Sequence, residues 1–396
     1  MTKQPNKSTD SLGKSRVSLI RCLEYSPEKL LSSLKKSLEL INFPLHHYRG
    51  KKVLLKPNVM MPKKYGFPAN THPLFVAAVI KIFQEIGAEV VIGESSAGSQ
   101  AGVTFTSRAL KTSGLSEVAE KAGVLLQNFD LADAVKVKVP NPFVSPVVLA
   151  KLLFEVDLVV SLPKLKTHTF ANIITGAIKN LYGCVPGQIK ADYHRRAPRP
   201  EEFYTVVCDI YQIIKPGLTI FDGVVAMEGN GPSAGQPRNL GVIIASQDGV
   251  AANAVVSQLI GVPPLRVLTT RMCAERSLGQ ADLEKIEIVG EKLAEVEVKD
   301  FKLPQVQVIN PGLYRLILRL TQTQPKINHK KCTLCGICAD SCPVGAISQV
   351  DQKMIIDYNQ CIRCFCCAEV CPTQAITPYR RYWIGNWLSQ LILRRW

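Results

Sequence analysis

The hydrophobic residues of this chain fall into short apolar runs that alternate with longer stretches of helical periodicity. Short apolar runs are typical of buried strands, and apolar residues at helical spacing indicate amphipathic helices. We expect strands at Val17–Cys22, Lys52–Lys56, Glu89–Gly93, Leu158–Leu162, Leu218–Val225 and Leu240–Ala245, and helices at Pro27–Ile41, Pro73–Ile86, Glu201–Ile214 and Val250–Ile260. Because strands and helices alternate, residues 17–300 are predicted to form an α/β domain with a mainly parallel, doubly wound sheet.

Polar clusters follow several of these apolar runs. A doubly wound sheet binds its ligands at the carboxyl ends of its strands, so residues in these positions are candidates for a site. The clusters are Lys56-Pro57-Asn58, Thr71-His72-Pro73, the segment from Gly93 to Gly98, and the segment from Ser161 to Gly187.

The last of these clusters is the richest in lysine. If the chain after Pro163 is extended, alternate side chains share a face, which groups Lys164, Lys166 and His168. The next stretch, 172–181, is expected to be a helix whose polar face would hold Asn172, Gly176, Lys179 and Asn180. Lysines supply point charges for oxyanions, and glycine lets a ligand approach the backbone, so we predict a phosphate or carboxylate pocket. The alternative is a solvated helix face with ordinary surface lysines.

The sequence suggests a role for each candidate. Oxyanion binding is assigned to Lys56, Lys164, Lys166 and Lys179, and orientation of the ligand to Asn58, Asn172 and Asn180. Glu94 and His168 are candidates for proton transfer, which reductive chemistry requires alongside electrons. His194, within the basic stretch YHRRAPRP, is expected in an exposed loop.

The C-terminal quarter contains one cysteine pattern twice. Cys332, Cys335, Cys338 and Cys342 are followed by Pro343, and the pattern recurs 29 residues later as Cys361, Cys364, Cys367 and Cys371 before Pro372. This spacing is typical of two [4Fe–4S] clusters in which the fourth cysteine of each run binds the other cluster. We therefore group Cys332, Cys335 and Cys338 with Cys371, and Cys361, Cys364 and Cys367 with Cys342. Two four-thiolate zinc sites are the alternative.

The segments CTLCGICADSCPVGAI and CIRCFCCAEVCPTQAI resemble the two halves of a bacterial-type 2[4Fe–4S] ferredoxin. The resemblance covers residues 327–378 and implies a small α+β ferredoxin-like domain. Each half would be a loop, a short helix and part of a β-hairpin, related by a pseudo-twofold axis. Cys366, beside the ligand Cys367, is an extra thiol in this pattern.

A second resemblance covers residues 17–290. The motifs LLKPN, THP, GESS, SLPKLKTH and GAIKNLYGCVPG resemble the family called domain of unknown function 362, whose members often carry a C-terminal ferredoxin. The resemblance implies this architecture and leaves the reaction open. The family commonly has an acid where this chain has Asn253, which puts in doubt any role that requires a carboxylate there.

Composition narrows the compartment and the partners. The formal net charge of the 396 residues is +16, which favours acidic redox partners, anionic small molecules or anionic membranes. No helix-turn-helix or zinc-finger pattern is present, so nucleic acid is not expected. The five cysteines outside the two runs show no disulfide framework, the N-terminus lacks the apolar core of a secretory signal, and no apolar stretch of about 18 residues appears. We expect a cytoplasmic protein.

Three segments are expected outside the two domains: a disordered N-terminus at 1–16, a linker at 301–326 and a tail at 379–396. The tail contains all three tryptophans and four arginines and has an apolar stripe at helical spacing. This composition is typical of an interfacial membrane helix, and a terminal helix packed on its own protein is the alternative.

Together these patterns predict an iron–sulfur electron-transfer protein. Its ferredoxin domain would exchange electrons between a redox partner protein and an α/β domain that binds an anionic small molecule or cofactor, as in a ferredoxin-linked oxidoreductase. The alternative is a non-enzymatic electron carrier or docking subunit, at the membrane surface if the tail binds lipid.

Overall fold

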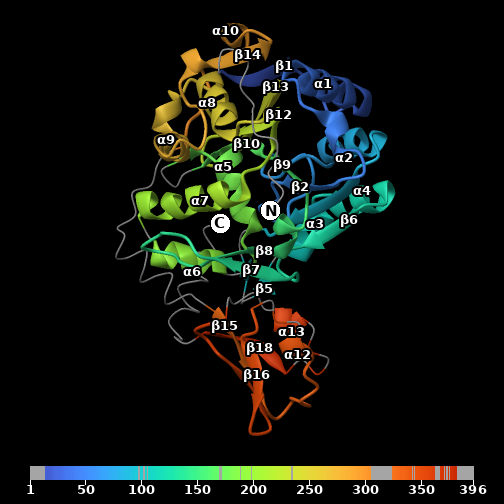
Figure 1. Cartoon of the computed structure of the whole chain (residues 1–396), viewed down its shortest axis with the longest axis vertical. Coiled ribbons are helices and arrows are strands. Elements are labelled where there is room, and N and C mark those ends of the chain that lie inside the picture. Colours follow the sequence, from blue (N-terminus) through green and yellow to red (C-terminus); the bar gives the residue numbers. More distant parts are fainter. Residues whose placement is uncertain are drawn as a thin grey trace.

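The structure is a computed structural model that describes residues 14–96, 99–100, 103–104, 106–168, 172–187, 189–197, 199–232, 235–304, 323–340, 342, 344–361, 366–369, 371, 373 and 375–380. Figure 1 shows a large part that ends at residue 304 and a small part, coloured orange to red, that begins at Thr323. We call them the α/β domain and the cysteine-rich domain.

A ten-stranded sheet forms the centre of the α/β domain, in the order β14-β1-β13-β12-β9-β2-β3-β6, with β10 paired to β12 and β11 paired to β10. β13 runs antiparallel to β1 and β12, and β11 antiparallel to β10, whereas the other pairs are parallel. The prediction of a mainly parallel sheet is therefore confirmed. The strands are β1 (Ser15–Arg21), β2 (Lys52–Pro57), β3 (Glu89–Glu94), β6 (Leu125–Asn128), β9 (Leu158–Leu162), β10 (Lys164–His168), β11 (Ile173–Ile174), β12 (Leu218–Glu228), β13 (Gln236–Ser246) and β14 (Ile286–Gly290).

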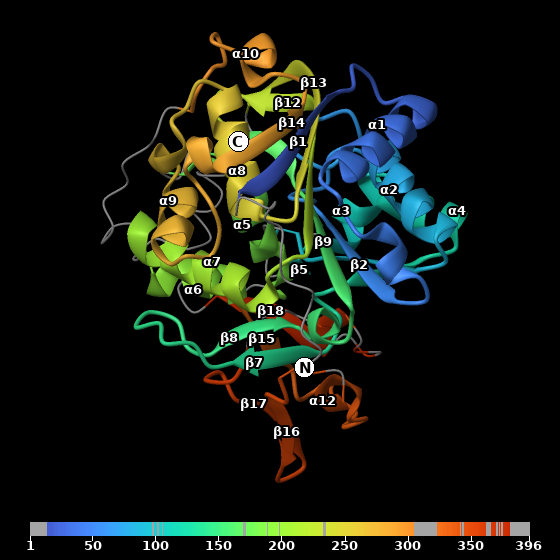
Figure 2. The same cartoon turned by 45° about the horizontal axis from the view of Figure 1, so that its top comes forward.

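Helices cover both faces of this sheet (Figures 1 and 2). One face carries α1 (Pro27–Leu40), α2 (Pro73–Glu85), α3 (Thr106–Thr112) and α4 (Leu115–Ala122), and the other carries α5 (Gly176–Asn180), α7 (Pro200–Ile214), α8 (Gly249–Leu259) and α9 (Leu268–Glu275). Successive strand side chains point to opposite faces. Val53 and Leu55 accordingly lie in the core below α2, and Leu54 lies in the core below α7. The doubly wound arrangement is confirmed.

Shorter elements complete the α/β domain. They are the helices α6 (Ile189–Arg196) and α10 (Leu293–Val296), the strand pairs β4 (Ser99–Gln100) with β5 (Val103–Thr104) and β7 (Ala134–Val137) with β8 (Val147–Ala150), and the 3-10 helices η1 (Leu45–Tyr48), η2 (Lys151–Phe154), η3 (Leu181–Cys184), η4 (Pro264–Arg266) and η5 (Leu283–Lys285). In both views α6 and the β7–β8 hairpin lie on the side of the α/β domain that faces the cysteine-rich domain.

The helix expected over 172–181 is much shorter in the structure. Ile173 and Gly176 both have φ of 63°, which interrupts a right-handed helix before Gly176. Residues 173–174 form β11 instead, and α5 begins at Gly176. Asn253 of α8 lies against this turn: its Oδ1 accepts a hydrogen bond from the Ala177 N–H at 2.7 Å, and its Nδ2 donates to Thr270 at 3.3 Å. Asn253 therefore has a structural role here, because it accepts from the turn and donates to Thr270.

The cysteine-rich domain repeats its elements as well as its cysteines. It contains β15 (Thr323–Ile327) paired with β18 (Ile376–Arg380), β16 (Ile347–Val350) paired with β17 (Lys353–Ile356), and the helices α12 (Ile337–Asp340) and α13 (Cys366–Glu369). α13 begins 29 residues after α12, as β18 does after β16. This agrees with the expected loop, helix and hairpin in each half. β15 begins within the segment expected to be a linker, and most of the predicted tail, 381–396, lies outside the described residues.

No helix in the ranges that the structure describes is both long and apolar enough to cross a membrane. Cys208 of α7 and Cys273 of α9 are buried, with their sulfur atoms 3.4 Å apart as thiols, although the sequence showed no pairing among the scattered cysteines.

A buried ion pair joins β10 to β12. The Lys164 Nζ lies 2.9 Å from Asp222 Oδ2, and both side chains are almost fully buried. Asp222 also accepts hydrogen bonds from the Tyr25 hydroxyl at 2.7 Å and the His72 N–H at 2.9 Å. The carboxylate thus compensates a buried ammonium group and holds two further segments against the sheet.

We expect Asp222→Ala to lower the free energy of unfolding by about 3–5 kcal/mol, because it leaves the Lys164 charge buried without a partner. Anaerobic urea unfolding followed by far-UV circular dichroism measures this. The control is Glu117→Ala, which breaks an exposed ion pair with Lys121 and should change little. An equally small effect at Asp222 would contradict the assignment.

Candidate functional site

A cavity of about 300 Å³ lies where β2, β3 and β10 end. We call it the lysine pocket, after Lys166, Lys179 and Lys190, which line it. Six of the nine residues expected from the sequence line the pocket: Asn58, Glu94, Lys166, His168, Lys179 and Asn180. Ser95, Thr175 and Tyr182 also line it and lie in the polar clusters recognised in the sequence, although no role was assigned to them. The sequence did not place Lys190 and His194 at the site, nor the apolar wall of Val59, Met60 and Pro232. The pocket therefore has the position that parallel-sheet topology predicts.

The three lysines come from three elements, β10, α5 and α6. Lys166 donates to the Ala69 carbonyl at 2.6 Å, and Lys190 donates to the Ser95 carbonyl at 2.9 Å. Lys179 lies over the rings of Tyr182 and Phe203, with 5.6 and 5.9 Å from its Nζ to their centroids, and forms no hydrogen bond or ion pair with a described residue. Its ammonium group is thus the one most available to a ligand.

Burial lowers the pKa of all three lysines, because a charged amine loses hydration in the interior. For Lys179 the pKa falls to about 8, with the Lys190 charge adding to the effect of burial. The two histidines are shifted in the same direction. Burial and nearby lysines place the pKa of His168 well below its usual value, and that of His194 at about 3. Both imidazoles are therefore neutral at physiological pH.

Glu94 is the carboxylate in the wall of the pocket, and it is fully engaged. Its Oε1 accepts from Lys56 Nζ at 2.8 Å and from the Ser95 N–H at 2.9 Å, while its Oε2 accepts from the Val59 N–H at 2.8 Å. Burial raises the pKa of Glu94, and Lys56 opposes that rise. A side chain at Gly183 would meet the Glu94 carboxylate and the Lys56 ammonium, 2.7 Å from the latter, so glycine is required there.

The charges around the pocket do not balance. Four buried or partly buried lysines, counting Lys56, are accompanied by two carboxylates, Glu94 and Asp130, the second of which acts on Lys190. Like charges in a low-dielectric site repel each other, and an anion in the pocket would relieve this repulsion. The Thr175 hydroxyl, on a residue that is 4% exposed, and Asn58 Oδ1 have no hydrogen-bond partner among the described residues, which is unusual for buried polar atoms. The excess of positive charge and the Thr175 hydroxyl favour an anionic ligand, whereas Asn58 Oδ1 needs a hydrogen-bond donor.

Three of the expected residues do not line the pocket. Lys56 lies behind its wall in the pair with Glu94, and Lys164 is paired with Asp222. Asn172 is buried elsewhere, where its Oδ1 accepts from the Thr269 N–H at 2.9 Å and its Nδ2 donates to the Ile174 carbonyl at 2.7 Å. The helical face that grouped Asn172 with Lys179 does not exist, because the helix begins only at Gly176.

The expectation of an exposed loop at His194 is wrong. His194 lies on α6, its ring stacked on Phe203 with centroids 3.8 Å apart. Lys190 and His194 are four residues apart and so share a helix face. That spacing was the available signal, but the neighbouring arginines and prolines made the segment resemble a loop.

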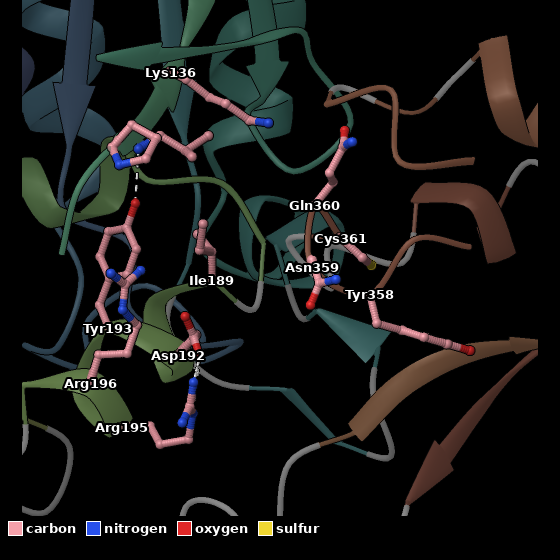
Figure 3. Close-up of a pocket in the computed structure, with 12 residues that line it drawn as sticks. Lys136, Ile189, Asp192, Tyr193, Arg195, Arg196, Tyr358, Asn359, Gln360 and Cys361 are labelled. Carbon is pink, nitrogen blue, oxygen red and sulfur yellow. Dashed lines mark hydrogen bonds and ion pairs between the residues drawn. The ribbon is translucent and has the colours of Figure 1, made fainter. Parts of the chain in front are cut away.

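α6 separates the lysine pocket from a second cavity, of about 400 Å³, between the two domains. Lys190 and His194 face the lysine pocket, whereas Ile189, Asp192, Tyr193 and Arg196 line this interdomain cavity. Figure 3 shows them opposite Tyr358, Asn359, Gln360 and Cys361 of the cysteine-rich domain. A helix with its side chains is about 10–12 Å across. One helix therefore lies between a cysteine of the second run and the lysine pocket.

The structure brings Cys332, Cys335, Cys338 and Cys371 to one cavity, whose walls include Ile327, Met354 and Ile376. These four thiols are the set grouped from the sequence, and an apolar cage with four sulfur donors fits a cubane cluster. Among the described residues, no group of three acidic, histidine or cysteine side chains is close enough to hold a single metal ion. Cys342, Cys361 and Cys367 pack around the same small core, and Cys364 lies outside the described residues.

Backbone N–H groups point at equivalent sulfurs in the two halves. The Ala346 N–H donates to Cys342 Sγ, and the Ala375 N–H donates to Cys371 Sγ, both at 3.2 Å. Hydrogen bonds to ligand sulfurs are one of the factors that set cluster potentials. The two halves therefore share a backbone hydrogen bond to the last cysteine as well as the cysteine spacing.

Comparisons with known proteins agree with these two domains. The family described as "Domain of unknown function (DUF362)" matches residues 53–258, and the one described as "4Fe-4S binding domain" matches residues 325–348, which include the first cysteine run. The "Thylakoid-associated protein sll1697" of Synechocystis sp. is 33% identical over 312 residues, which cover 76% of this chain and 92% of that protein.

Among solved structures, the lactate racemase apoprotein from Thermoanaerobacterium thermosaccharolyticum is similar, with a TM-score of 0.38 and 15% identity. The aligned region covers 58% of this chain and 54% of that chain.

Proposed function

This chain belongs to the family described as Domain of unknown function (DUF362), and from that premise we propose that its cysteine-rich domain exchanges electrons with an anionic small molecule bound in the lysine pocket. The 4Fe-4S binding domain supports an iron–sulfur electron-transfer role with at least one cluster. The proposal that the two domains exchange electrons rests on the position of α6, which has one face on the lysine pocket and the other beside Cys361.

We propose two clusters, although the matched 4Fe-4S region ends at residue 348. When bound, such clusters accept and release single electrons. Support for a second one comes from the repeat, because α13 matches α12 in position and the Ala375 N–H matches the Ala346 N–H in its bond to sulfur. Cys342 and Cys361, assigned to the second cluster, pack against the same core as the first.

The lysine pocket would hold a ligand that carries a carboxylate, phosphate or similar oxyanion. Lys179 and Lys166 supply positive charge beside Asn58, whose Nδ2 donates to Asn180 Oδ1 at 3.0 Å and whose Oδ1 can accept from a donor group of the ligand. Asn180 holds Asn58 in place, because its own amide is bonded to Asn58, Ser161 and the Lys56 carbonyl. With a pKa of about 8, Lys179 is protonated at neutral pH and can donate a proton. His168 is neutral and can accept one. Glu94 fits a positioning role better than the expected proton transfer, because three donors already hold it.

We expect anaerobically purified protein to contain about eight irons per chain, and Cys371→Ala to lower this to about four, because the variant removes one ligand from the cage formed with the first run. Iron and sulfide assays with electron paramagnetic resonance after dithionite reduction measure both values. Cys22→Ala, which changes a buried thiol of the α/β domain, is the control and should retain all the iron. Four irons in the unmodified protein would contradict the second cluster.

We expect Lys179→Met to weaken sulfate binding at least tenfold, because methionine keeps the packing against Tyr182 and Phe203 but removes the charge. Sulfate does not titrate near neutral pH. Its affinity for the unmodified protein should therefore fall as the pH rises through about 8, where Lys179 loses its proton, and this dependence should be absent from the variant. Calorimetry measures both.

The control for Lys179→Met is Lys285→Met, which changes an exposed lysine with a side chain 67% accessible. Mass spectrometry of the anions released on denaturing the native protein identifies the natural ligand. Added back to the reduced protein, that ligand should reoxidise the clusters, and more slowly in Lys179→Met. If no anion is released, and if sulfate binds equally to the unmodified protein and to Lys179→Met, the α/β domain serves instead to dock a redox partner.

Peripheral membrane contact through the tail is a further proposal. It is supported by the thylakoid association in the name of the similar Synechocystis protein and by the tryptophans and arginines of the tail. Residues 381–396 of this tail lie outside the described residues. We expect the full chain to float with phosphatidylglycerol vesicles and the chain truncated after Arg380 to remain in solution. Equal partitioning of the two would contradict this proposal.

A further inference from the structure

The interdomain cavity has the properties of a ligand site distinct from the lysine pocket. Its volume of about 400 Å³ falls within the range of small-molecule sites, and both domains contribute to its lining. We propose that it binds a small organic molecule through a phosphate or carboxylate group, held between the Arg196 side of α6 and the turn before Cys361. This inference goes beyond the proposed role of the lysine pocket and does not depend on it.

The charges on the α/β side of the cavity favour an anion. Arg195 is paired with Asp192 of the same helix, with Nε and a terminal nitrogen 3.0 and 2.6 Å from Asp192 Oδ1. Arg196 and Lys136 also line the cavity, and neither forms an ion pair within the described part of the chain. The charged side chains on the α/β side, Lys136, Asp192, Arg195 and Arg196, thus carry a net charge of +2. A guanidinium group can bind a carboxylate or phosphate with two parallel hydrogen bonds.

The cysteine-rich side supplies uncharged polar groups from a fixed turn. Asp357 organises this turn: its Oδ1 accepts from the Asn359 N–H at 2.8 Å, and its carbonyl accepts from the Gln360 and Cys361 N–H groups at 3.2 and 2.9 Å. The side chains of Asn359 and Gln360 line the cavity (Figure 3). No hydrogen bond joins them to Arg196 among the described residues, so the two sides do not close on each other directly.

The first half of the repeat provides an internal comparison. There Asn328 organises the equivalent turn, accepting from the Lys330 N–H at 3.0 Å. The positions that correspond to Asn359 and Gln360 are Lys330 and Lys331, both exposed. The turn is retained while two lysines are replaced by two amides in the half that faces the arginines of α6. Lysines there would repel Arg196, whereas amides can donate to an oxyanion held by it.

The remaining wall suits the body of an organic ligand rather than an inorganic ion alone. It consists of Pro146, Val148, Ile189 and the ring of Tyr193, whose hydroxyl oxygen is fixed by the Val148 N–H at 2.8 Å. A ligand that places its anionic group on Arg196 and its apolar part on this wall would lie beside Cys361. Added negative charge next to a cluster lowers its reduction potential, because the reduced state carries one more negative charge.

The test uses the full-length holoprotein with Lys179→Met as background, in which anion binding in the lysine pocket is expected to be at least tenfold weaker. Pyrophosphate and malonate are the probes for phosphate and carboxylate chemistry, measured by calorimetry and by redox titration with paramagnetic resonance. We expect saturable binding of at least one probe, with a downward shift in the potential of one cluster. The probe that binds more tightly identifies the chemistry of the natural group.

Arg196→Gln should weaken this binding at least tenfold. Gln360→Glu, which places a carboxylate on the opposite wall and leaves α6 intact, should do the same and shows that the effect does not come from a misfolded helix. Arg271→Gln, on the exposed side of α9, is the matched control and should bind like its parent. The proposal is overturned if neither probe binds, if both cavity variants retain the affinity, or if binding leaves the cluster potentials unchanged.

Discussion

The proposed site of the α/β domain depends on one electrostatic feature. Several lysine side chains are buried close together, with too few carboxylates to balance their charge. Lys166, Lys179 and Lys190 enter one pocket from three elements, and burial lowers the pKa of each. The Glu94–Lys56 pair does not reduce this excess, because it is neutral as a unit and each of its charges already has its partner. Proteins seldom keep unpaired buried charges unless those charges serve binding or catalysis. An oxyanion in the pocket would supply the missing negative charge.

The topology explains why this pocket lies next to the iron–sulfur region. The carboxyl ends of β2, β3 and β10 meet at one edge of the sheet, and residues of α5 and α6 line the pocket there. α6 contributes polar side chains to two different cavities. Lys190 and His194 on one face line the lysine pocket, and Tyr193 and Arg196 on the other line the interdomain cavity. One short helix therefore contributes to the walls of both the lysine pocket and the interdomain cavity.

Much of this could be predicted from the sequence, and the failures have identifiable causes. Apolar runs such as Leu158–Leu162 are buried on both faces, so periodicity located the strands, and the cysteine spacing located the cage that includes Cys371. The pairing of Lys164 with Asp222 could not be predicted, because the two residues are 58 positions apart and meet only through the pairing of β10 with β12. The positive φ at Ile173 could not be predicted either, because β-branched residues rarely adopt it, and it moves Asn172 away from the site. His194 was missed because its helix is short and rich in charge.

The two halves of the cysteine-rich domain share the hydrogen bonds around their cysteines and differ in the exposed residues of one turn. Both halves retain an Asn or Asp that organises the turn before the first cysteine, and both retain the alanine N–H that donates to the last sulfur. They differ in the exposed positions of that turn, where the first half has Lys330 and Lys331 and the second has Asn359 and Gln360. The uncharged turn lines the interdomain cavity, and the basic turn does not. An acidic redox partner would therefore be attracted to the turn beside Cys332, which leaves the half with Cys361 to serve the α/β domain. The two turns of a symmetric scaffold thus differ in charge, and the uncharged turn is the one that lies opposite α6.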